Sequence, residues 1–511
     1  MVHSVPDALL DQLAGYVAAH MGLHFPRERQ KDLGRGISAA AREFNFKDAE
    51  SCIRWLISAP LSKHQIEVLA SHLTVGETYF YRDKAAFAFL EETIFPELIR
   101  SRCNGERRLR VWSAGCASGE EPYSIAILLS RMISAWKEWN PFILATDINP
   151  QSLQKASAGI YSNWSFRDCP SWLQTGCFKK NDEGHFGILP HLRRRVTFSY
   201  LNLAEDVYPS VYNNTNAMDV VICRNVLMYF TPERAKQVID KLHRSLIDGG
   251  WLIISPSEAS QELLSQFVAV PCGDTIVYRK ARRAQTIPTS NAFPKFEDTE
   301  QSTLPSDTSL CKTIQEYRLP LESSAVEAVT APVIYVDYSP RTLPDPSPKE
   351  QAQRLYMQGD YERAGAILLS ALEKEPDDAE FLTLLARCRA NQGSLTEAVE
   401  WCEKAIAIDR LNPASHFLRA MILQERGATE DAVQSFRSTL YLDQEFVPAH
   451  FALGSLARMQ GKKVEAARHF QNALSLLSRY RPEEIVREFD GMTAGRLIEV
   501  IRTAGAIRNA E

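Results

Sequence analysis

Residues Leu109 to Ile127 read LRVWSAGCASGEEPYSIAI, and the fold can be predicted outward from this stretch. Its apolar start up to Trp112 predicts the end of a buried strand, and Gly115 and Gly119 predict a tight loop. Pro122, followed by apolar residues at helical spacing, predicts the start of a helix. Such a strand, glycine loop and helix unit binds nucleotide-like ligands at the carboxyl end of its strand, because small residues let backbone amides approach the ligand. We therefore expect Gly115 to contact a cofactor.

The acids in this loop indicate which cofactor it binds. A dinucleotide places its pyrophosphate at the amino end of the helix, where the paired carboxylates of Glu120 and Glu121 would repel it. S-adenosylmethionine carries a sulfonium and an ammonium and no phosphate, so the same carboxylates suit it. A nicotinamide-dependent oxidoreductase is the main alternative enzyme class, and these two acids disfavour it.

Length and composition limit the class of protein. The 511 residues predict two or three domains, and the formal net charge of -5 gives no overall attraction to nucleic acid or to an anionic membrane. The ten cysteines include no Cys-x-x-Cys pair, and no apolar run approaches the roughly 20 residues that span a bilayer. Residues 1–11 lack the basic and then apolar order of a secretory signal. We expect a cytoplasmic protein with reduced thiols, no nucleic-acid partner and no membrane insertion.

The amino-terminal part, residues 1–73, has apolar residues at helical spacing and is predicted to be a helical domain. Its region around Lys31 and Arg35 is basic. A solvated helix face is the ordinary explanation, and a docking face for an acidic protein partner is the alternative.

Residues 74–282 alternate predicted strands with predicted helices, which indicates an α/β fold with a doubly wound sheet. The stretch 142–148 predicts a second buried strand that ends at Asp147, where an acid in nucleoside-binding sheets accepts hydrogen bonds from the ribose hydroxyls. In the connector before the first strand, Arg82 follows three aromatic residues, and a cation in such surroundings normally has an anionic partner. Residues 177–188 predict a small hairpin inserted into the fold.

The carboxyl-terminal half has a different pattern. Residues 283–347 are rich in Pro, Ser and Thr and are predicted to be a flexible linker. From residue 348 to 482, four glycines recur at intervals of 34 residues, which is the period of tetratricopeptide repeats: Gly359, Gly393, Gly427 and Gly461. About four helix pairs are expected, with a concave groove for a peptide or protein segment. Residues 483–511 are left as a tail.

Five segments, in order along the chain, together resemble the CheR family of chemotaxis receptor glutamate methyltransferases. They are FYR (80–82), SAGCASGEEPYS (113–124), ATDI (145–148), LNL (201–203) and CRNVLMYF (223–230). The resemblance covers residues from about 10 to 280. No single segment is decisive, but the ordered set is specific.

The resemblance implies a helical domain followed by a Rossmann-like methyltransferase domain with a small inserted sheet. It also implies S-adenosyl-L-methionine as methyl donor, S-adenosyl-L-homocysteine as product, no metal, and glutamates on a receptor's cytoplasmic domain as acceptors. The residues it implies as cofactor contacts are Gly76, Thr78, Arg82, Glu121 or its neighbour Glu120, Asp147, Asn202, Leu203, Arg224 and Asn225. It places Arg82 and Tyr229 beside the reacting atoms, and it makes Lys31 and Arg35 the receptor-docking residues.

Three departures from the family pattern affect these expectations. Gly76 stands where the family often has Asn, so a contact there would come from the backbone or from Glu77. Residues 255–258 read SPSE in place of a Gly-His-Ser-Glu type turn. The hairpin after Cys177 does not keep the glycine-rich turn that holds a receptor's carboxyl-terminal peptide, so the repeats could supply recognition instead, or could mediate self-association.

Two further readings of the function stay open at this point. Fused repeats of this kind also occur in relatives that serve surface-sensing and biofilm pathways, so the pathway is either motility or surface growth. The alternative to an enzyme is a catalytically inactive S-adenosylmethionine-binding domain that acts as a scaffold for the repeats.

Overall fold

Four helices form the amino-terminal part of the computed structural model, which describes residues 5–103, 106–136, 138–273, 275–281 and 346–482, and short pieces between 484 and 502. They are α1 (Asp7–Met21), α2 (Gln30–Glu43), α3 (Ala49–Ile57) and α4 (Lys63–Leu73). Their apolar stripes form one core, and α4 begins with a capping box between Ser62 and Gln65. Nearly all of the predicted linker and most of the predicted tail lie outside the described residues, so the domain boundaries stay predictions.

A mixed sheet of seven strands follows, in the order β6-β2-β1-β7-β8-β10-β9. The parallel strands are β6 (Val196–Tyr200), β2 (Asn140–Asp147), β1 (Arg108–Ala114), β7 (Met218–Ile222) and β8 (Leu246–Ile253). The antiparallel strands β10 (Thr275–Lys280) and β9 (Phe267–Cys272) complete one edge. Every residue of β1 and β7 is buried, as expected for central strands covered on both faces. The predicted Rossmann-like α/β fold is confirmed.

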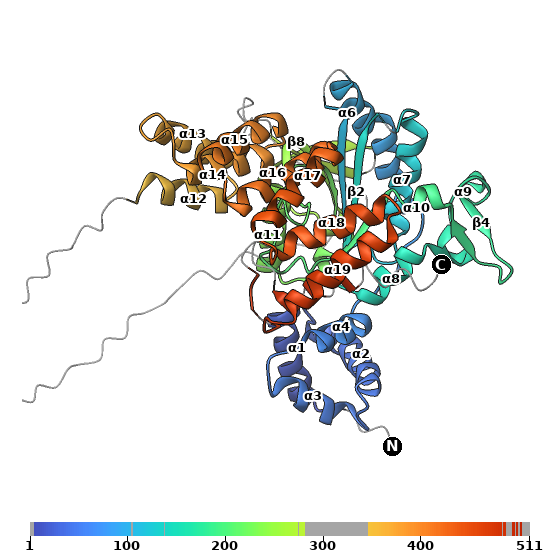
Figure 1. Cartoon of the computed structure of the whole chain (residues 1–511). Coiled ribbons are helices and arrows are strands. Elements are labelled where there is room, and N and C mark those ends of the chain that lie inside the picture. The colour runs from blue at the N-terminus through green and yellow to red at the C-terminus, as the bar shows by residue number, and fades with distance from the viewer. Residues whose placement is uncertain are drawn as a thin grey trace, which may run out of the picture. The chain divides into compact units, whose positions relative to one another are not determined.

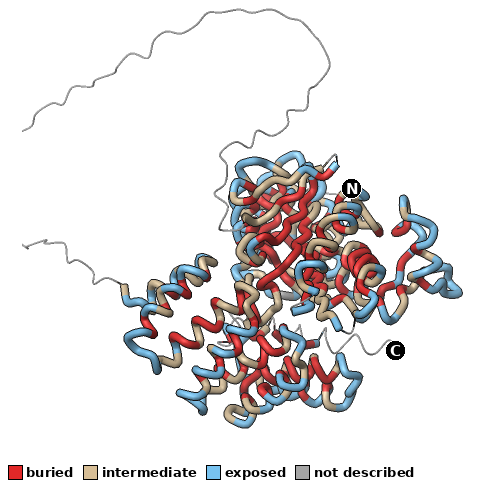
Figure 2. Tube along the Cα trace, turned by 90° about the horizontal axis from the view of Figure 1, so that it is seen from above, coloured by how far each residue is buried: buried red, intermediate tan, exposed pale blue. Residues whose placement is uncertain are grey.

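Helices connect the strands and cover the sheet. They are α5 (Lys84–Phe89), α6 (Phe95–Arg102), α7 (Glu120–Met132), α8 (Pro150–Ala158) and α11 (Pro232–Ser245). Figure 1 shows α7 and α11 beside the strands, and Figure 2 shows that the buried segments gather inside the unit while exposed segments lie around them. Among the described residues, no helix combines the length and apolar character that a bilayer crossing requires.

The predicted insertion is present as a sheet of three short strands in the order β3-β5-β4. They are β3 (Ile160–Tyr161), β5 (Phe186–Ile188) and β4 (Phe178–Lys180), accompanied by α9 (Ser171–Cys177) and α10 (Pro190–Arg193). The ring of Phe80 stacks on Phe166 and meets Tyr161 and Phe178 edge to face, with centroids 4.9–5.0 Å apart. This aromatic cluster joins the insertion to the connector before the sheet.

Four helix pairs form the predicted repeats. They are α12 (Pro348–Met357) with α13 (Tyr361–Leu372), α14 (Ala379–Asn391) with α15 (Leu395–Ile408), α16 (Pro413–Arg426) with α17 (Thr429–Leu442), and α18 (Val447–Met459) with α19 (Lys463–Leu477). The four glycines at 34-residue spacing lie between the helices of each pair with φ of +74° to +87°, a conformation that glycine adopts without strain. The pairs, the sheet and the first four helices belong to one compact unit.

Candidate functional site

A cavity of about 290 Å³ lies where β1, β2 and β7 end. Parallel strands of a doubly wound sheet end at one edge, so residues that follow different strands meet there. Of the residues proposed from the sequence, those that line the cavity are Gly76, Thr78, Arg82, Gly115, Glu121, Asp147, Asn202, Leu203, Arg224, Asn225 and Tyr229. Glu77, offered from the sequence as a substitute for the contact at Gly76, also lines the cavity. The sequence reasoning missed other lining residues: Met21, Leu23, Thr74, Val75, Cys116, Ala117, Ile148, Ser152, Leu201, Val226, Met228 and Phe230.

The glycine loop follows β1 and forms one side of the cavity. The amides of Gly115 and Cys116 both donate to the carbonyl of Thr146 in β2, at 2.8 and 2.9 Å. Gly115 has a φ of +85°, and a Cβ there would lie 2.3 Å from the Cγ2 of Val226. Only glycine therefore lets the loop pass this close to the segment after β7.

Asp147 ends β2, and its carboxylate lines the cavity. One oxygen accepts from the amide of Ala117 and the other from the amide of Asn149, each at 2.8 Å. Burial raises the pKa of this carboxyl, and the backbone amides act against that rise. Each oxygen has another lone pair, so the carboxylate can still accept hydroxyl donors.

The two acids of the loop differ in position. Glu121 lines the cavity, and its carboxylate accepts from the hydroxyl of Ser113 at 2.7 Å. Burial raises the pKa of Glu121, while the guanidinium of Arg224, 3.8 Å away, lowers it. Glu120, the other acid expected to contact the cofactor, is not among the residues that line the cavity. Its buried carboxylate accepts from the hydroxyls of Ser118 and Ser165, which ties α7 to the inserted subdomain.

Arg82 and Arg224 hold the connector against the sheet. The Nη1 of Arg82 donates to the carbonyl of Glu77 at 2.8 Å. Arg224, whose side chain is 7% exposed, donates to the carbonyl of Arg82 at 2.7 Å and to the Asp83 carboxylate at 3.0 Å. Tyr81 and Asp83 both have positive φ. Such backbone strain persists only where neighbours fix it, and Arg224 is one of those neighbours.

Tyr229 connects the cavity to the first four helices. Its ring lies under the guanidinium of Arg29 at 5.2 Å, and its carbonyl accepts from the amide of His24 at 2.7 Å. Burial raises the pKa of its hydroxyl, so it is protonated at neutral pH. With Met21 and Leu23 in the lining, the amino-terminal helices form one wall of the site.

Glu258 organises the segment after β7, and the sequence reasoning assigned it no such role. Its carboxylate accepts from the amides of Asn225 at 2.7 Å and Met228 at 3.2 Å. Asn225 has a φ of +57°. Glu258 thereby fixes the backbone of two lining residues.

The two predicted docking residues lie on α2 and outside the cavity lining. Lys31 is exposed, and Arg35 is 81% exposed and forms an ion pair with Asp32. At the cavity, Val75 and Met228 are 64% and 56% exposed. The lining therefore includes apolar side chains that reach solvent.

Comparison with known proteins gives two family matches. Residues 76–275 match the CheR methyltransferase, SAM binding domain, and residues 349–416 match the tetratricopeptide repeat. Chemotaxis protein methyltransferase 1 of Pseudomonas aeruginosa is 35% identical over 222 residues, which is 42% of this chain and 77% of that protein. Chemotaxis protein methyltransferase Cher2 of Pseudomonas putida is 32% identical over 217 residues, 42% of this chain and 76% of that protein. The chemotaxis protein methyltransferase of Borreliella burgdorferi is 29% identical over 251 residues, which is 49% of this chain and 87% of that protein.

Proposed function

Because the chain belongs to the CheR family of chemotaxis protein methyltransferases, we propose that it transfers a methyl group from S-adenosylmethionine to glutamate side chains on the cytoplasmic domain of a chemoreceptor. The single observation that supports this most is the cavity, whose lining includes Glu121, Asp147 and Arg82 from three separate segments.

The lining residues fit this cofactor. Two carboxylates in one cavity suit a ligand that carries a sulfonium, an ammonium and hydroxyl donors. Gly115 lets the backbone approach the ligand closely, because a Cβ at that position would already meet Val226. We propose that Asp147 accepts from the ribose hydroxyls and that Glu121 faces the positive part of the cofactor, with Gly76, Thr78, Asn202, Leu203, Arg224 and Asn225 as further contacts.

When bound, the cofactor supplies an electrophilic methyl group on a positively charged sulfur. An exposed glutamate has a pKa of about 4.3, so it is already ionised at neutral pH and no residue of this chain has to act as a base. The chain's own residues align the carboxylate and exclude water, which contributes up to about 7–11 kcal/mol in well-oriented reactions. We propose that Arg82 and the hydroxyl of Tyr229 position the acceptor.

Receptor docking is proposed for Lys31 and Arg35, whose exposed side chains on α2 suit an acidic protein surface. A protein partner is also proposed for the repeats. We propose that the enzyme acts in the cytoplasm, beside the receptor's signalling domain.

The function is tested with tritiated S-adenosylmethionine and membranes that contain candidate receptors. We expect radioactivity on the receptor that alkali releases as methanol, because carboxyl methyl esters hydrolyse in base.

Arg82→Ala should lose most of this activity, since it removes the group that orients the acceptor, and the exposed Arg100→Ala is the matched control. Asp147→Ala should mainly weaken cofactor binding, measured by calorimetry.

Two results would contradict the proposal. Near-normal methylation by Arg82→Ala would remove Arg82 from the site, and unchanged cofactor affinity in Asp147→Ala would remove the ribose contact. Cofactor binding with no methyl transfer to any receptor would favour the inactive scaffold.

A further inference from the structure

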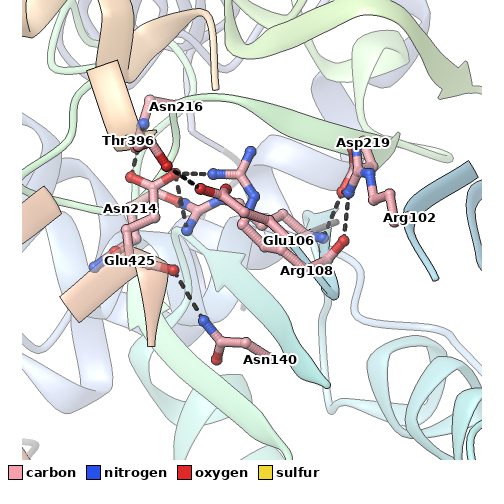
Figure 3. Close-up of polar contacts among 10 residues, drawn as sticks. Arg102, Glu106, Arg108, Asn140, Asn214, Asn216, Asp219, Thr396 and Glu425 are labelled. Carbon is pink, nitrogen blue, oxygen red and sulfur yellow. Dashed lines mark hydrogen bonds and ion pairs between the residues drawn. The ribbon is translucent and has the colours of Figure 1, made fainter. Parts of the chain in front are cut away.

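The repeats contact the methyltransferase sheet through a buried acid, Glu425 of α16. Its carboxylate pairs with Arg108 at 2.8 Å and lies 3.6 Å from Arg110. The other oxygen accepts from the Asn216 amide at 3.1 Å, and the backbone carbonyl of Glu425 accepts from the Asn140 amide at 2.9 Å. Figure 3 shows these groups converging on Glu425. The side chains of Glu425, Arg108 and Arg110 are 1%, 7% and 2% exposed.

Three of the four repeat glycines lie against the same surface. A Cβ at Gly359 would lie 2.3 Å from Arg244, a Cβ at Gly393 would lie 3.0 Å from Arg108, and a Cβ at Gly427 would lie 3.1 Å from Asn140. The fourth glycine, Gly461, has nothing within 4 Å. Successive repeats therefore contact the methyltransferase domain through the same position of the 34-residue pattern, the first at α11 and the next two at β1 and β2.

A loop of the methyltransferase domain packs on the first helices of the repeats. Val211 is 3% exposed and belongs to the core that α14, α16 and α18 share. The ring of Tyr212 stacks on Phe417 with centroids 5.6 Å apart, and its hydroxyl accepts from Arg387 at 2.9 Å. The first helices of the central repeats therefore already contact an aromatic side chain of their own chain, Tyr212.

We propose that the repeat domain is a fixed brace of the methyltransferase sheet, and that the first helices of its central repeats bind this chain's own loop 208–216. The protein partner proposed above for the repeats would then bind their other surfaces. Two buried arginines are costly without an acid beside them, and Glu425 lies within 4 Å of both. The occupant of this surface is therefore part of the same chain.

This contact lies at the end of the sheet where the parallel strands begin, whereas the cavity lies at the end where they finish. Arg108 and Asn140 are the first residues of β1 and β2, whereas Gly115 follows the last residue of β1 and Asp147 is the last residue of β2. Seven residues of strand, at about 3.3 Å each, separate the two ends by roughly 20 Å. The repeats consequently do not cover the cofactor site, and the contact is not a lid.

A disulfide trap in the full chain tests the docking. A Cβ at Gly393 would lie 4.0 Å from the Cβ of Ala217, within the span of a disulfide. We expect Gly393→Cys with Ala217→Cys to form the cross-link, identified by mass spectrometry of the linked peptides. Gly461→Cys with Ala217→Cys is the matched control, because Gly461 has the same positive φ and open space around it. No cross-link, or an equal yield in the control, would overturn the proposal.

Hydrogen exchange on the full chain tests whether loop 208–216 is bound by the repeats. This test does not depend on the cysteine variants. We expect the amides of 208–216 to be protected in the wild type and to exchange at least 10-fold faster in Glu425→Ala, with Glu425→Gln in between. The control Glu430→Ala changes an exposed acid in the first turn of the next helix and should leave exchange unchanged. Fast exchange of this loop in the wild type would show that the repeats do not hold it.

S-adenosylmethionine affinity should stay within 2-fold in Glu425→Gln, and a 10-fold loss would contradict a brace remote from the cofactor site.

Discussion

The lining residues of the cavity are held by neighbours that lie far away in the sequence. Asn225 adopts a positive φ, and the carboxylate that binds its amide comes from Glu258, 33 residues later. The carbonyl of Tyr229 is held by His24, which is more than 200 residues earlier. The shape of the cavity therefore depends on Glu258 and His24, which do not line it themselves.

Glu258→Ala should weaken S-adenosylmethionine binding although Glu258 does not line the cavity. The variant leaves the amides of Asn225 and Met228 without their acceptor, which costs about 1–3 kcal/mol and corresponds to a roughly 5- to 150-fold loss of affinity. Calorimetry on the full chain measures this. Glu262→Ala, an exposed acid nearby in the sequence, is the control. Equal affinities for both variants would show that the segment holds its shape without Glu258.

Cofactor affinity should fall as the pH is lowered from neutral. Burial raises the pKa of Glu121 and Asp147 above their ordinary values of 4.5 and 3.8. Ionised carboxylates accept hydroxyl donors and attract a sulfonium, so binding favours the deprotonated forms and releases protons at acid pH. Titrations between pH 7.5 and 5.5 should show the decline, and Asp147→Asn should show weaker binding with a flatter profile. A pH-independent affinity would contradict ionised carboxylates as contacts.

The part of the lining that follows strand ends could be predicted from the sequence. Gly115 and Asp147 come directly after apolar runs, and parallel strands bring such positions together. The choice between Glu120 and Glu121 could not be predicted. Adjacent helical residues point about 100° apart, and the sequence does not fix how α7 is rotated about its axis.

At the scale of elements, strongly periodic segments were predictable and irregular ones were not. The central strands and the repeats have long apolar patterns. Strand β9 was missed because it contains Pro271, which lacks a backbone donor and argues against a strand. The structure explains how the strand tolerates this proline: β9 lies at the edge of the sheet and pairs only with β10.

The last helix pair contains two buried histidines with linked protonation. The Nε2 of His450 lies 3.1 Å from the carbonyl of Gln444, which can only accept, so Nδ1 of His450 is the acceptor for Nδ1–H of His469 at 3.1 Å. If the pair bound a second proton, the Nδ1–H groups of both histidines would point at each other and neither would have an acceptor. Burial and its neighbour lower the pKa of His469 to about 4, and burial lowers the pKa of His450.

The α18–α19 pair should therefore lose stability as the pH falls from about 6.5 towards 4. In that window the unfolded histidines bind protons that the folded pair excludes, so the free energy of unfolding decreases with falling pH. His469→Gln should reduce the difference between urea unfolding at pH 7.5 and pH 5 by about 1–2 kcal/mol. His191→Gln, at an exposed position, should leave that difference unchanged. An unaltered difference in His469→Gln would exclude the pair as its source.

At the scale of the whole molecule, the sequence predicted the repeats from their period but not what they contact. One signal was present in the sequence. The position two residues before each repeat glycine holds Met357, Asn391, Glu425 and Met459, so one charge stands among uncharged residues. Its partners Arg108 and Arg110 are more than 300 residues away, and nothing in the sequence pairs them with it.

Glu425→Ala should destabilise the full chain by about 3–5 kcal/mol, because it leaves two buried arginines without their acid. Chemical denaturation with separate probes on the sheet and on the repeats measures this loss. Glu430→Ala should stay within about 0.5 kcal/mol of the wild type, as surface substitutions usually do. A loss below 1 kcal/mol in Glu425→Ala would mean that water replaces the carboxylate.

The open turn at Gly461 has a consequence for how such chains can change over evolutionary time. The first three turns contact the methyltransferase domain, whereas a Cβ at the fourth would meet nothing within 4 Å. A segment inserted at this turn would leave the contacts of the other three turns in place. New recognition surfaces could thus be acquired by addition at this turn, while the arrangement that carries the chemistry is inherited intact.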